Sequence, residues 1–272
     1  MTPEQVGELK IIANVLGRRA TYKYRTYFPD TGPLRRELYP RSLQFWAAGA
    51  KVRERLFLAA NRTSKTVSAS FEIAAHATGE YYPWWPGRRF PGATSWWCAG
   101  DTRETTRDII QYELFGPREG IRSGIYDGMV PAHRILDRTL KSGIADALDT
   151  VWIRHNERQH GAPMTSTVQF KSYDQGRLSF QGTSLSGGVW LDEEPPDSQE
   201  TVSGGGTPSG NGDIYTECLL RTATTDGVLM VTLTPLRGYT PFLQQYLETA
   251  EMCDAEGAIV NAKLGIFGEE AA

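Results

Sequence analysis

Cysteine is scarce in this sequence, and its few copies are scattered. Cys98, Cys218 and Cys253 are the three cysteines among 272 residues, and none belongs to a CxxC pair. An odd, dispersed set of thiols is typical of a reducing compartment and argues against a disulfide framework. The four histidines lack the spacing of a zinc finger or a metalloprotease. We therefore expect no zinc site.

A long apolar segment and a surplus of positive charge are also absent. The N-terminus lacks the apolar core of a signal peptide, and no stretch approaches the length of a transmembrane helix. We therefore expect a cytoplasmic protein. The formal net charge is -3, so any contact with DNA must come from a local patch. A hydrophobic content of 40% is ordinary for a globular α/β domain of this length.

Short apolar runs alternate with helical patterns along most of the chain. We expect helices at 3–19, 41–53, 66–78 and 102–114, and strands at 56–58, 95–99, 151–153, 188–191 and 229–233. The runs 167–173 and 178–181 flank Asp174-Gln175-Gly176, which is a hairpin signal. The pattern predicts an α/β fold, with a mostly parallel central sheet flanked by helices and one antiparallel hairpin. The Gly/Ser/Thr-rich stretch 198–213 is expected to be a flexible surface loop.

A candidate phosphate-binding loop follows the first strand. Its sequence is Ala-Ala-Asn-Arg-Thr-Ser-Lys-Thr at 59–66, between an apolar run and a helix. In this context the backbone N–H groups of Asn61, Arg62, Thr63 and Ser64 would surround the phosphates, Lys65 would reach the β- and γ-phosphates, and the Thr66 hydroxyl would bind Mg²⁺. The alternative is an ordinary strand-to-helix turn with a surface lysine.

The match to the consensus GxxxxGK[ST] is imperfect. Ala59 stands at the first glycine position and Ser64 at the second. The second replacement matters more, because that position lies close to the phosphates and prefers a backbone typical of glycine.

An acidic strand end provides the second signal. The run Gly-Val-Trp-Leu at 188–191 leads into Asp192, Glu193 and Glu194. Asp192 would hold Mg²⁺, usually through water, and Glu193 would polarise the attacking water as a general base. Glu194 is a weaker candidate for either role. A solvated acidic loop is the alternative, but an upstream P-loop in the right order favours an ATPase.

Other candidate residues lie near these two motifs. Thr232 and Thr234 end the last apolar strand and could sense the γ-phosphate, although a β-branched strand before a proline turn is equally consistent. An arginine from the same chain or a neighbour could stabilise phosphoryl transfer, and the candidates, each otherwise a surface arginine, are Arg62, Arg103 and Arg107. Gln44 could pair with the adenine edge and Tyr39 could stack on the base; the alternative for Gln44 is a surface position at a helix N-terminus.

Taken together, these residues resemble the large terminase subunits of tailed phages. The resemblance rests on RERLFLAANRTSKT, AAHATGEYYPWWPGRRF, FKSYDQGRLSFQGTSLSGGVWLDEEPP, IYTECLLRT and MVTLTPLRG, and it spans about residues 36 to 245. It implies an ASCE-type P-loop ATPase that uses ATP and Mg²⁺ to move double-stranded viral DNA into a procapsid in the host cytoplasm. It also implies a homo-oligomeric ring at the portal protein and a small terminase subunit as partner.

The resemblance assigns roles to individual residues. It places the Walker A role on Lys65 and Thr66, the Walker B and catalytic roles on Asp192 and Glu193, and the coupling role on 232–235. An adenine-side role for Gln44 and a trans-acting arginine near Arg107 are looser implications.

The sequence also departs from the family pattern. Family members continue into an RNase H-like nuclease domain. We expect an adenine-side segment at 1–50, a P-loop core at 51–272 and no C-terminal nuclease domain or nuclease activity in this chain. The alternative functions are a nucleotide-binding assembly protein with little turnover, a helicase-like DNA translocase, and a structural capsid or adaptor component.

Overall fold

Nine strands in the described part of the chain form one sheet, in the order β3-β4-β5-β2-β6-β7-β1-β9-β8. The computed structural model describes residues 7, 22–124, 126–196, 213–249, 251–252 and 263–267. The strands are β1 (Glu54–Leu58), β2 (Ser95–Gly100), β3 (Ile135–Leu140), β4 (Leu148–Gln159), β5 (Ala162–Ser172), β6 (Gly188–Asp192), β7 (Val228–Leu233), β8 (Glu251–Met252) and β9 (Lys263–Phe267). All neighbouring pairs are parallel except β3–β4 and β4–β5. The predicted α/β class with a mostly parallel sheet is confirmed.

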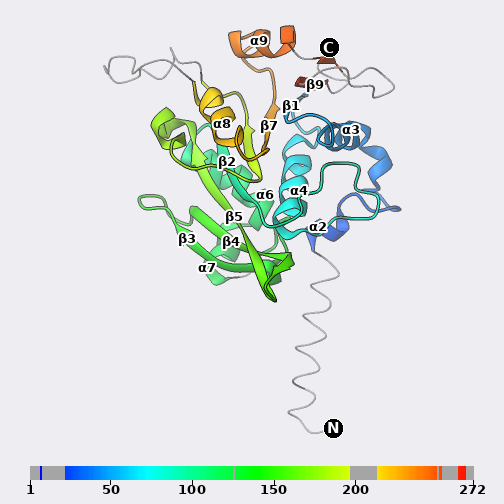
Figure 1. Cartoon of the computed structure of the whole chain (residues 1–272), viewed down its shortest axis with the longest axis vertical. Helices are drawn as coiled ribbons and strands as arrows, with labels where there is room; N and C mark the ends of the chain where they lie inside the picture. Colours follow the sequence, from blue (N-terminus) through cyan, green and yellow to red (C-terminus); the bar gives the residue numbers. More distant parts are fainter. Residues whose placement is uncertain are drawn as a thin grey trace.

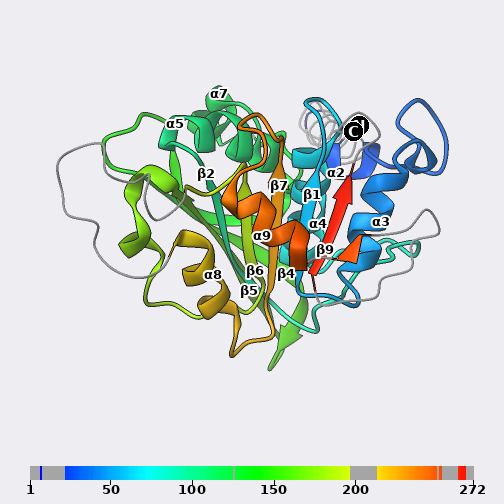
Figure 2. The ribbon, with the colours of Figure 1, turned by 90° about the horizontal axis from the view of Figure 1, so that it is seen from above.

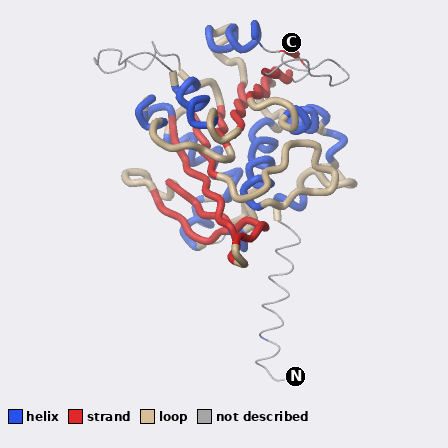
Figure 3. The backbone as a smooth tube through the Cα atoms, in the orientation of Figure 1, coloured by secondary structure: helices blue, strands red, loops and turns tan. Residues whose placement is uncertain are grey.

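The helices connect the strands and cover both faces of the sheet (Figures 1 and 3). The α-helices are α2 (Lys23–Thr26), α3 (Pro40–Ala48), α4 (Lys65–Thr78), α5 (Arg103–Thr105), α6 (Tyr112–Phe115), α7 (Arg118–Ser123), α8 (Ile214–Thr222) and α9 (Pro241–Thr249). A π-helical turn, Thr106–Gln111, joins α5 to α6, and 3₁₀ turns occur at Arg36–Leu38, Ala132–Arg134, Tyr173–Gln175 and Arg177–Phe180. No helix in the described ranges is both long enough and apolar enough to cross a bilayer.

Two hydrophobic cores lie on opposite faces of the sheet. Successive side chains of a strand point to opposite faces, so Phe57 of β1 and Trp190 of β6 enter the core shared with α3 and α4. Their neighbours Leu56 and Leu191 enter the core shared with α8 and α9. Figure 2 shows α8 and α9 on one side of the central strands. The central strands are therefore buried on both faces, as a parallel sheet requires.

Helix α4 follows β1 through a short loop and ends where the sequence indicates. Gly79 adopts φ 70° and donates its N–H to the Ala75 carbonyl, which is the left-handed C-terminal cap that glycine permits at low cost. A Cβ at Gly79 would lie 2.5 Å from His155 Nε2, so the close packing also requires glycine. The predicted helix at 66–78 is confirmed.

Most other predicted elements are also confirmed, with different ends. The strands at 56–58, 95–99, 188–191 and 229–233 are β1, β2, β6 and β7, and 151–153 is the middle of β4. The helix expected at 41–53 ends at Ala48, because the chain turns at Gly49, where a Cβ would lie 2.7 Å from Arg55 Nη1. The helix at 102–114 is present, with the π turn inside it. The elements expected at 3–19 and 198–213 lie outside the described residues, save Gly7 and Asp213.

The hairpin expected around Asp174-Gln175-Gly176 is wrong. That segment forms two consecutive 3₁₀ turns at the carboxyl end of β5, where the Gln175 side chain accepts the Ser172 N–H at 3.1 Å. The antiparallel pairs are instead β3–β4 and β4–β5. The β4–β5 connection turns at His160 and Gly161, which both have positive φ (51° and 82°). Two consecutive left-handed residues match the twist of a tight hairpin.

Candidate active site

The P-loop and the acidic strand end meet at the carboxyl edge of three parallel strands. Strand β7 lies between β1 and β6, with Leu58 opposite Leu233 and Asp192 opposite Thr232. Neighbouring strands are about 4.8 Å apart, so the loop after β1 and the carboxylates after β6 are about 10 Å apart across β7. The carboxyl edge of an open α/β sheet is where ligands bind in such folds.

The P-loop folds around a buried lysine. Lys65 is 7% exposed, and its Nζ donates to the Ala60 carbonyl at 2.6 Å. Thr63 Oγ1 donates to the same carbonyl at 2.7 Å. Burial lowers the pKa of Lys65, and the carboxylates of Glu193 and Asp192 oppose that shift. An ordinary turn with a surface lysine, the alternative interpretation, does not describe this loop.

Two P-loop residues adopt left-handed backbone conformations. Arg62 has φ 64°, and Ser64 has φ 66° and ψ 12° at the N-cap of α4. The left-handed region is costly for residues with a Cβ. The expectation that position 64 favours a glycine-type backbone therefore matches the observed geometry, and a serine accommodates it here.

Asp192 and Thr66 face each other across the carboxyl edge. Thr66 Oγ1 lies 3.4 Å from Asp192 Oδ1, and Asp192 is 6% exposed. Burial raises the pKa of Asp192 to about 7, although hydrogen bonds from Thr232 and Thr66 lower it. A buried carboxylate beside a hydroxyl is an all-oxygen donor set, which fits a hard divalent cation. The described residues contain no cluster of three or more Asp, Glu, His or Cys ligands, so phosphates and water would complete such a coordination shell.

Glu193 is held in a fixed position beside Asp192. Its backbone is left-handed, with φ 68°, and its N–H donates to the Thr232 carbonyl at 2.7 Å. The side-chain Oε2 accepts the Thr234 N–H at 3.1 Å. Burial raises the pKa of Glu193, while the hydrogen bond from Thr234 and the charge of Lys65 lower it. A carboxylate made more basic by burial is suited to general base catalysis. Glu194 follows it and is half-buried.

The two threonines of β7 and the following turn have different partners. Thr232 is fully buried; its Oγ1 donates to Asp192 Oδ1 at 2.6 Å and accepts the Trp190 indole N–H at 2.8 Å. Thr234 Oγ1 donates to Asn61 Oδ1 of the P-loop at 3.1 Å. Thr232 therefore positions the acidic strand end, whereas Thr234 connects β7 with the P-loop.

The adenine-side candidates lie on or beside α3. Gln44 accepts a hydrogen bond from Arg41 at 3.0 Å, and both side chains are half-buried. The Tyr39 ring packs edge-on against Phe28, with centroids 5.0 Å apart. Tyr39 therefore has a packing role at the start of α3.

The three candidate arginines lie in different places. Arg62 is exposed on the P-loop itself. Arg103 lies 3.6 Å from Asp174, and Arg107 binds Asp108 through two nitrogens at 2.8 and 3.0 Å. These acidic partners belong neither to the P-loop nor to the acidic strand end, so Arg62 is the one of the three that the fold places at this site within a single chain.

One further residue at the site has no counterpart among the sequence predictions. The Tyr173 hydroxyl donates to the carbonyl oxygens of Glu193 and Asp192, at 3.0 and 3.3 Å. It thereby fixes the backbone that carries both carboxylates. The contact depends on the neighbouring ends of β5 and β6 in the folded sheet, and no local sequence pattern indicates it.

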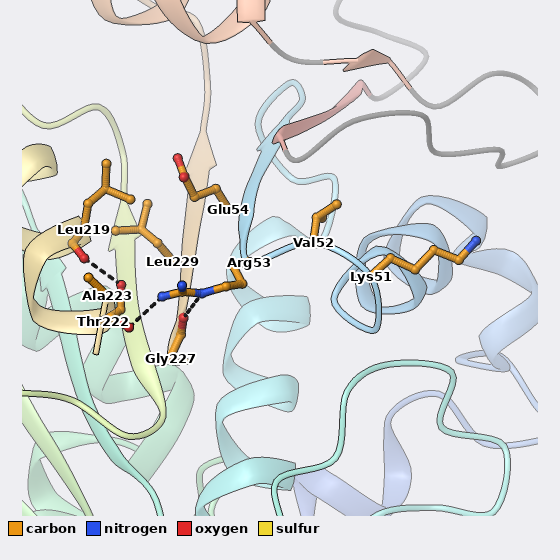
Figure 4. A pocket seen from close by; sticks show the side chains of 9 residues that line it. All are labelled: Lys51, Val52, Arg53, Glu54, Leu219, Thr222, Ala223, Gly227 and Leu229. Carbon is orange, nitrogen blue, oxygen red and sulfur yellow. Dashed lines mark hydrogen bonds between the residues drawn. The ribbon is translucent and has the colours of Figure 1, made fainter. Parts of the chain in front are cut away.

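A cavity of about 420 Å³ lies at the opposite edge of the sheet (Figure 4). It is lined by Lys51, Val52, Arg53, Glu54, Leu219, Thr222, Ala223, Gly227 and Leu229. The Arg53 guanidinium crosses it and donates to the carbonyls of Thr222 and Gly227, at 2.6 and 3.0 Å. The cavity lies at the start of β1 and the P-loop follows its end, so it is separate from the candidate site.

The strand order and the edge that carries Lys65, Thr66 and the two carboxylates define a P-loop nucleoside triphosphatase fold of the ASCE type, with one strand between the P-loop strand and the acidic strand. The sequence is 28% identical over 257 residues to the terminase large subunit of Salmonella phage P22; the match covers 90% of this chain and 46% of that protein. The chain is thus related to phage large terminase subunits, and it spans about half the length of this curated relative.

Solved structures show the same fold. The large terminase ATPase domain of Thermus phage P74-26 is similar with a TM-score of 0.50 and 14% identity, over 83% of this chain and 79% of that chain. A lower TM-score of 0.46, with 14% identity over 84% of this chain and 44% of that chain, relates it to the large terminase of a second thermophilic bacteriophage, which was solved in complex with ADP. No protein-family model matches the chain.

Proposed function

We propose that this chain is the ATP-hydrolysing motor domain of a phage large terminase, which couples hydrolysis to the movement of double-stranded DNA into a procapsid. The observation that carries this proposal is the convergence of a buried Lys65 with Thr66, Asp192 and Glu193 at one edge of the sheet. The relationship to the phage P22 terminase subunit supports the choice of a packaging motor among P-loop ATPases. On this proposal the chain acts in the host cytoplasm, with the portal protein, the small terminase subunit and further copies in a ring as partners.

Each site residue has a defined task in this reaction. ATP hydrolysis joins a water oxygen to the γ-phosphorus and breaks the bond from that phosphorus to the ADP oxygen. Lys65 and the N–H groups at the start of α4 hold the phosphates, and Glu193 orients the water and accepts its proton. Thr66 and Asp192 would hold Mg²⁺, which neutralises phosphate charge when bound.

The remaining candidate residues have supporting tasks. Gln44 faces the adenine side from α3, with Tyr39 supporting that helix. Thr234 links the γ-phosphate side of the P-loop to β7 through Asn61. Arg62 acts from its own chain, whereas Arg103 and Arg107 are candidates for a neighbouring copy, because they lie outside the site of their own chain.

Steady-state ATP hydrolysis with Mg²⁺ tests the proposal. We expect Lys65→Ala to lose nucleotide binding and turnover, and Glu193→Gln to bind ATP but lose at least about 100-fold in turnover, a typical contribution of a general base. Lys51→Ala, an exposed lysine beside the opposite cavity, is the matched control and should behave like the parent.

Equilibrium binding of ADP and ATP completes the experiment. Parent chain that binds nucleotide without turnover would favour the assembly-protein alternative over a motor. Parent chain that binds neither ADP nor ATP, in a folded state, would contradict the P-loop assignment.

A further inference from the structure

Three serine hydroxyls connect the P-loop with helix α3, and the proposed function uses none of them. Ser42 lies on α3, Ser64 ends the P-loop, and Ser68 lies in the first turn of α4. The Oγ atoms of Ser42 and Ser68 are 2.7 Å apart, and those of Ser42 and Ser64 are 3.3 Å apart. Ser68 Oγ also lies 2.8 Å from the Ser64 carbonyl oxygen. Ser42 and Ser68 are almost completely buried, at 1% and 0% exposure.

The location of this hydroxyl cluster coincides with the strained residue of the P-loop. Ser64 has φ 66°, a conformation that glycine adopts freely and serine adopts at a cost. A glycine at this position would relieve the cost, but it would have no hydroxyl to reach Ser42. Ser64 Oγ also donates to the Thr63 carbonyl at 2.5 Å. The serine side chain is therefore anchored on both sides of the strained residue.

Helix α3 is itself firmly attached to α4. The Trp46 indole N–H donates to the Ser68 carbonyl at 3.0 Å. Further along α3, the Phe45 carbonyl accepts a hydrogen bond from the buried Arg55, which also binds Glu72 of α4. Ser42 is thus a fixed point from which a hydroxyl can hold the P-loop backbone.

We infer that Ser42 is a positioning residue for the nucleotide: through Ser64 and Ser68 it holds the P-loop backbone in the left-handed conformation that directs N–H groups toward the phosphates. This inference rests on the proposed function. It replaces the freedom of the consensus glycine with a hydrogen-bonded serine. Since Ser42 acts through the Ser64 hydroxyl, its effect must depend on which residue stands at position 64.

A double-mutant cycle tests this dependence. The affinity for ADP is measured for the full chain, Ser42→Ala, Ser64→Gly and the double variant. A hydrogen bond of ordinary strength corresponds to a roughly fivefold to tenfold weaker affinity in Ser42→Ala. In the Ser64→Gly background, we expect the same Ser42 substitution to change the affinity by less than about twofold. If hydrolysis is measurable, KM should rise while kcat stays unchanged, because the lost contact serves binding.

Ser70→Ala is the matched control. Ser70 is a fully buried serine on the same helix, and its hydroxyl donates to the Val67 carbonyl at 3.0 Å, within α4. A merely structural loss would lower the thermal midpoint in Ser42→Ala and Ser70→Ala alike and leave the ADP affinity of the folded protein unchanged. Ser64→Ala, which keeps the Cβ and removes the hydroxyl, gives a second route if Ser42→Ala does not fold, and it should weaken ADP binding to a similar extent.

The outcomes separate this inference from the proposed function. Parent-like ADP affinity in Ser42→Ala and Ser64→Ala would overturn it, as would an equal loss in both backgrounds at position 64. If the folded parent binds no ADP, the proposed function fails first, and the inference fails with it.

Discussion

Thr232 shows how one buried hydroxyl can determine where a charge lies. Its Oγ1 is placed between the Trp190 indole and the Asp192 carboxylate, with no exposure to solvent. A hydroxyl can donate one hydrogen bond and accept another, and Thr232 does both. The carboxylate of Asp192 is therefore fixed by the neighbouring strand as well as by its own.

Replacing Thr232 by valine should disturb both stability and turnover. Valine preserves the shape but leaves the indole N–H and the carboxylate without this partner, at a cost of about 1–3 kcal/mol in the free energy of unfolding. We expect denaturant unfolding to show this loss, and ATP turnover to fall because Asp192 is no longer held toward Thr66. Thr216→Val, at an exposed position of α8, is the control. Unchanged turnover in Thr232→Val would contradict the positioning role.

At the scale of elements, α4 depends on a buried ionic network. Arg55 of β1 donates to both carboxylate oxygens of Glu72, at 2.7 and 3.1 Å, and His76 Nε2 lies 3.2 Å from Glu72 Oε1. His76 Nδ1 lies 3.0 Å from the Tyr81 hydroxyl. A neutral imidazole protonated at Nε2 satisfies both partners. The network ties the middle of α4 to the strand that precedes the P-loop.

Removing one charge from this network should be costly. Glu72→Gln leaves the fully buried Arg55 without its counter-ion, which typically costs about 3–5 kcal/mol. We expect chemical denaturation to show a loss of this size. The exposed ion pair between Arg35 and Glu37 provides a control, because Glu37→Gln should change stability little. A loss in Glu72→Gln as small as that in Glu37→Gln would show that the buried charge is compensated in another way.

The sequence was sufficient to predict the elements that bury their own periodic pattern. The apolar runs of β1, β6 and β7 and the capped helix α4 have strong local signals, so they were predicted within a few residues. The hairpin at 174–176 was misplaced, because the turn-forming residues there cap the end of β5. The shorter signal at His160-Gly161 depends on the pairing of β4 with β5, which is a non-local property.

The candidate site was predictable to the extent that it follows single strands. Lys65, Thr66, Asp192 and Glu193 each sit directly after or before an apolar run, and the structure brings them to one edge. Tyr173 and Ser42 were missed because their contacts come from other strands and helices, at separations that no short motif encodes. Arg103 and Arg107 resemble any surface arginine in sequence, and their partners in the fold are nearby acids.

At the scale of the whole molecule, the buried imidazole of His76 connects stability with pH. Burial lowers the pKa of His76, even though the hydrogen bond to Glu72 raises it. Unfolded histidine binds a proton below about pH 6.5, whereas the folded protein resists protonation there. The contribution of His76 is therefore present above the unfolded pKa and is lost as pH falls from about 6.5 toward the lower folded pKa.

We expect the free energy of unfolding to decrease by up to about 1.4 kcal/mol per pH unit in this window from His76 alone. Denaturant titrations between about pH 5 and 7 measure the slope. His76→Gln should flatten it, whereas the exposed His160→Gln should leave it unchanged. An equal slope in His76→Gln and the parent would assign the acid sensitivity to other groups.

Trp190 gives the site an optical property. Its indole N–H binds Thr232, and Thr232 binds the carboxylate of Asp192. Indole emission shifts with hydrogen bonding and with nearby charge, so any ion or phosphate that changes the field at Asp192 should alter the colour or intensity of the light that Trp190 emits. A Trp190→Phe variant identifies this contribution among the seven tryptophans. The hydrogen bond that holds the carboxylate in place thus also makes it visible to a fluorimeter without an added label.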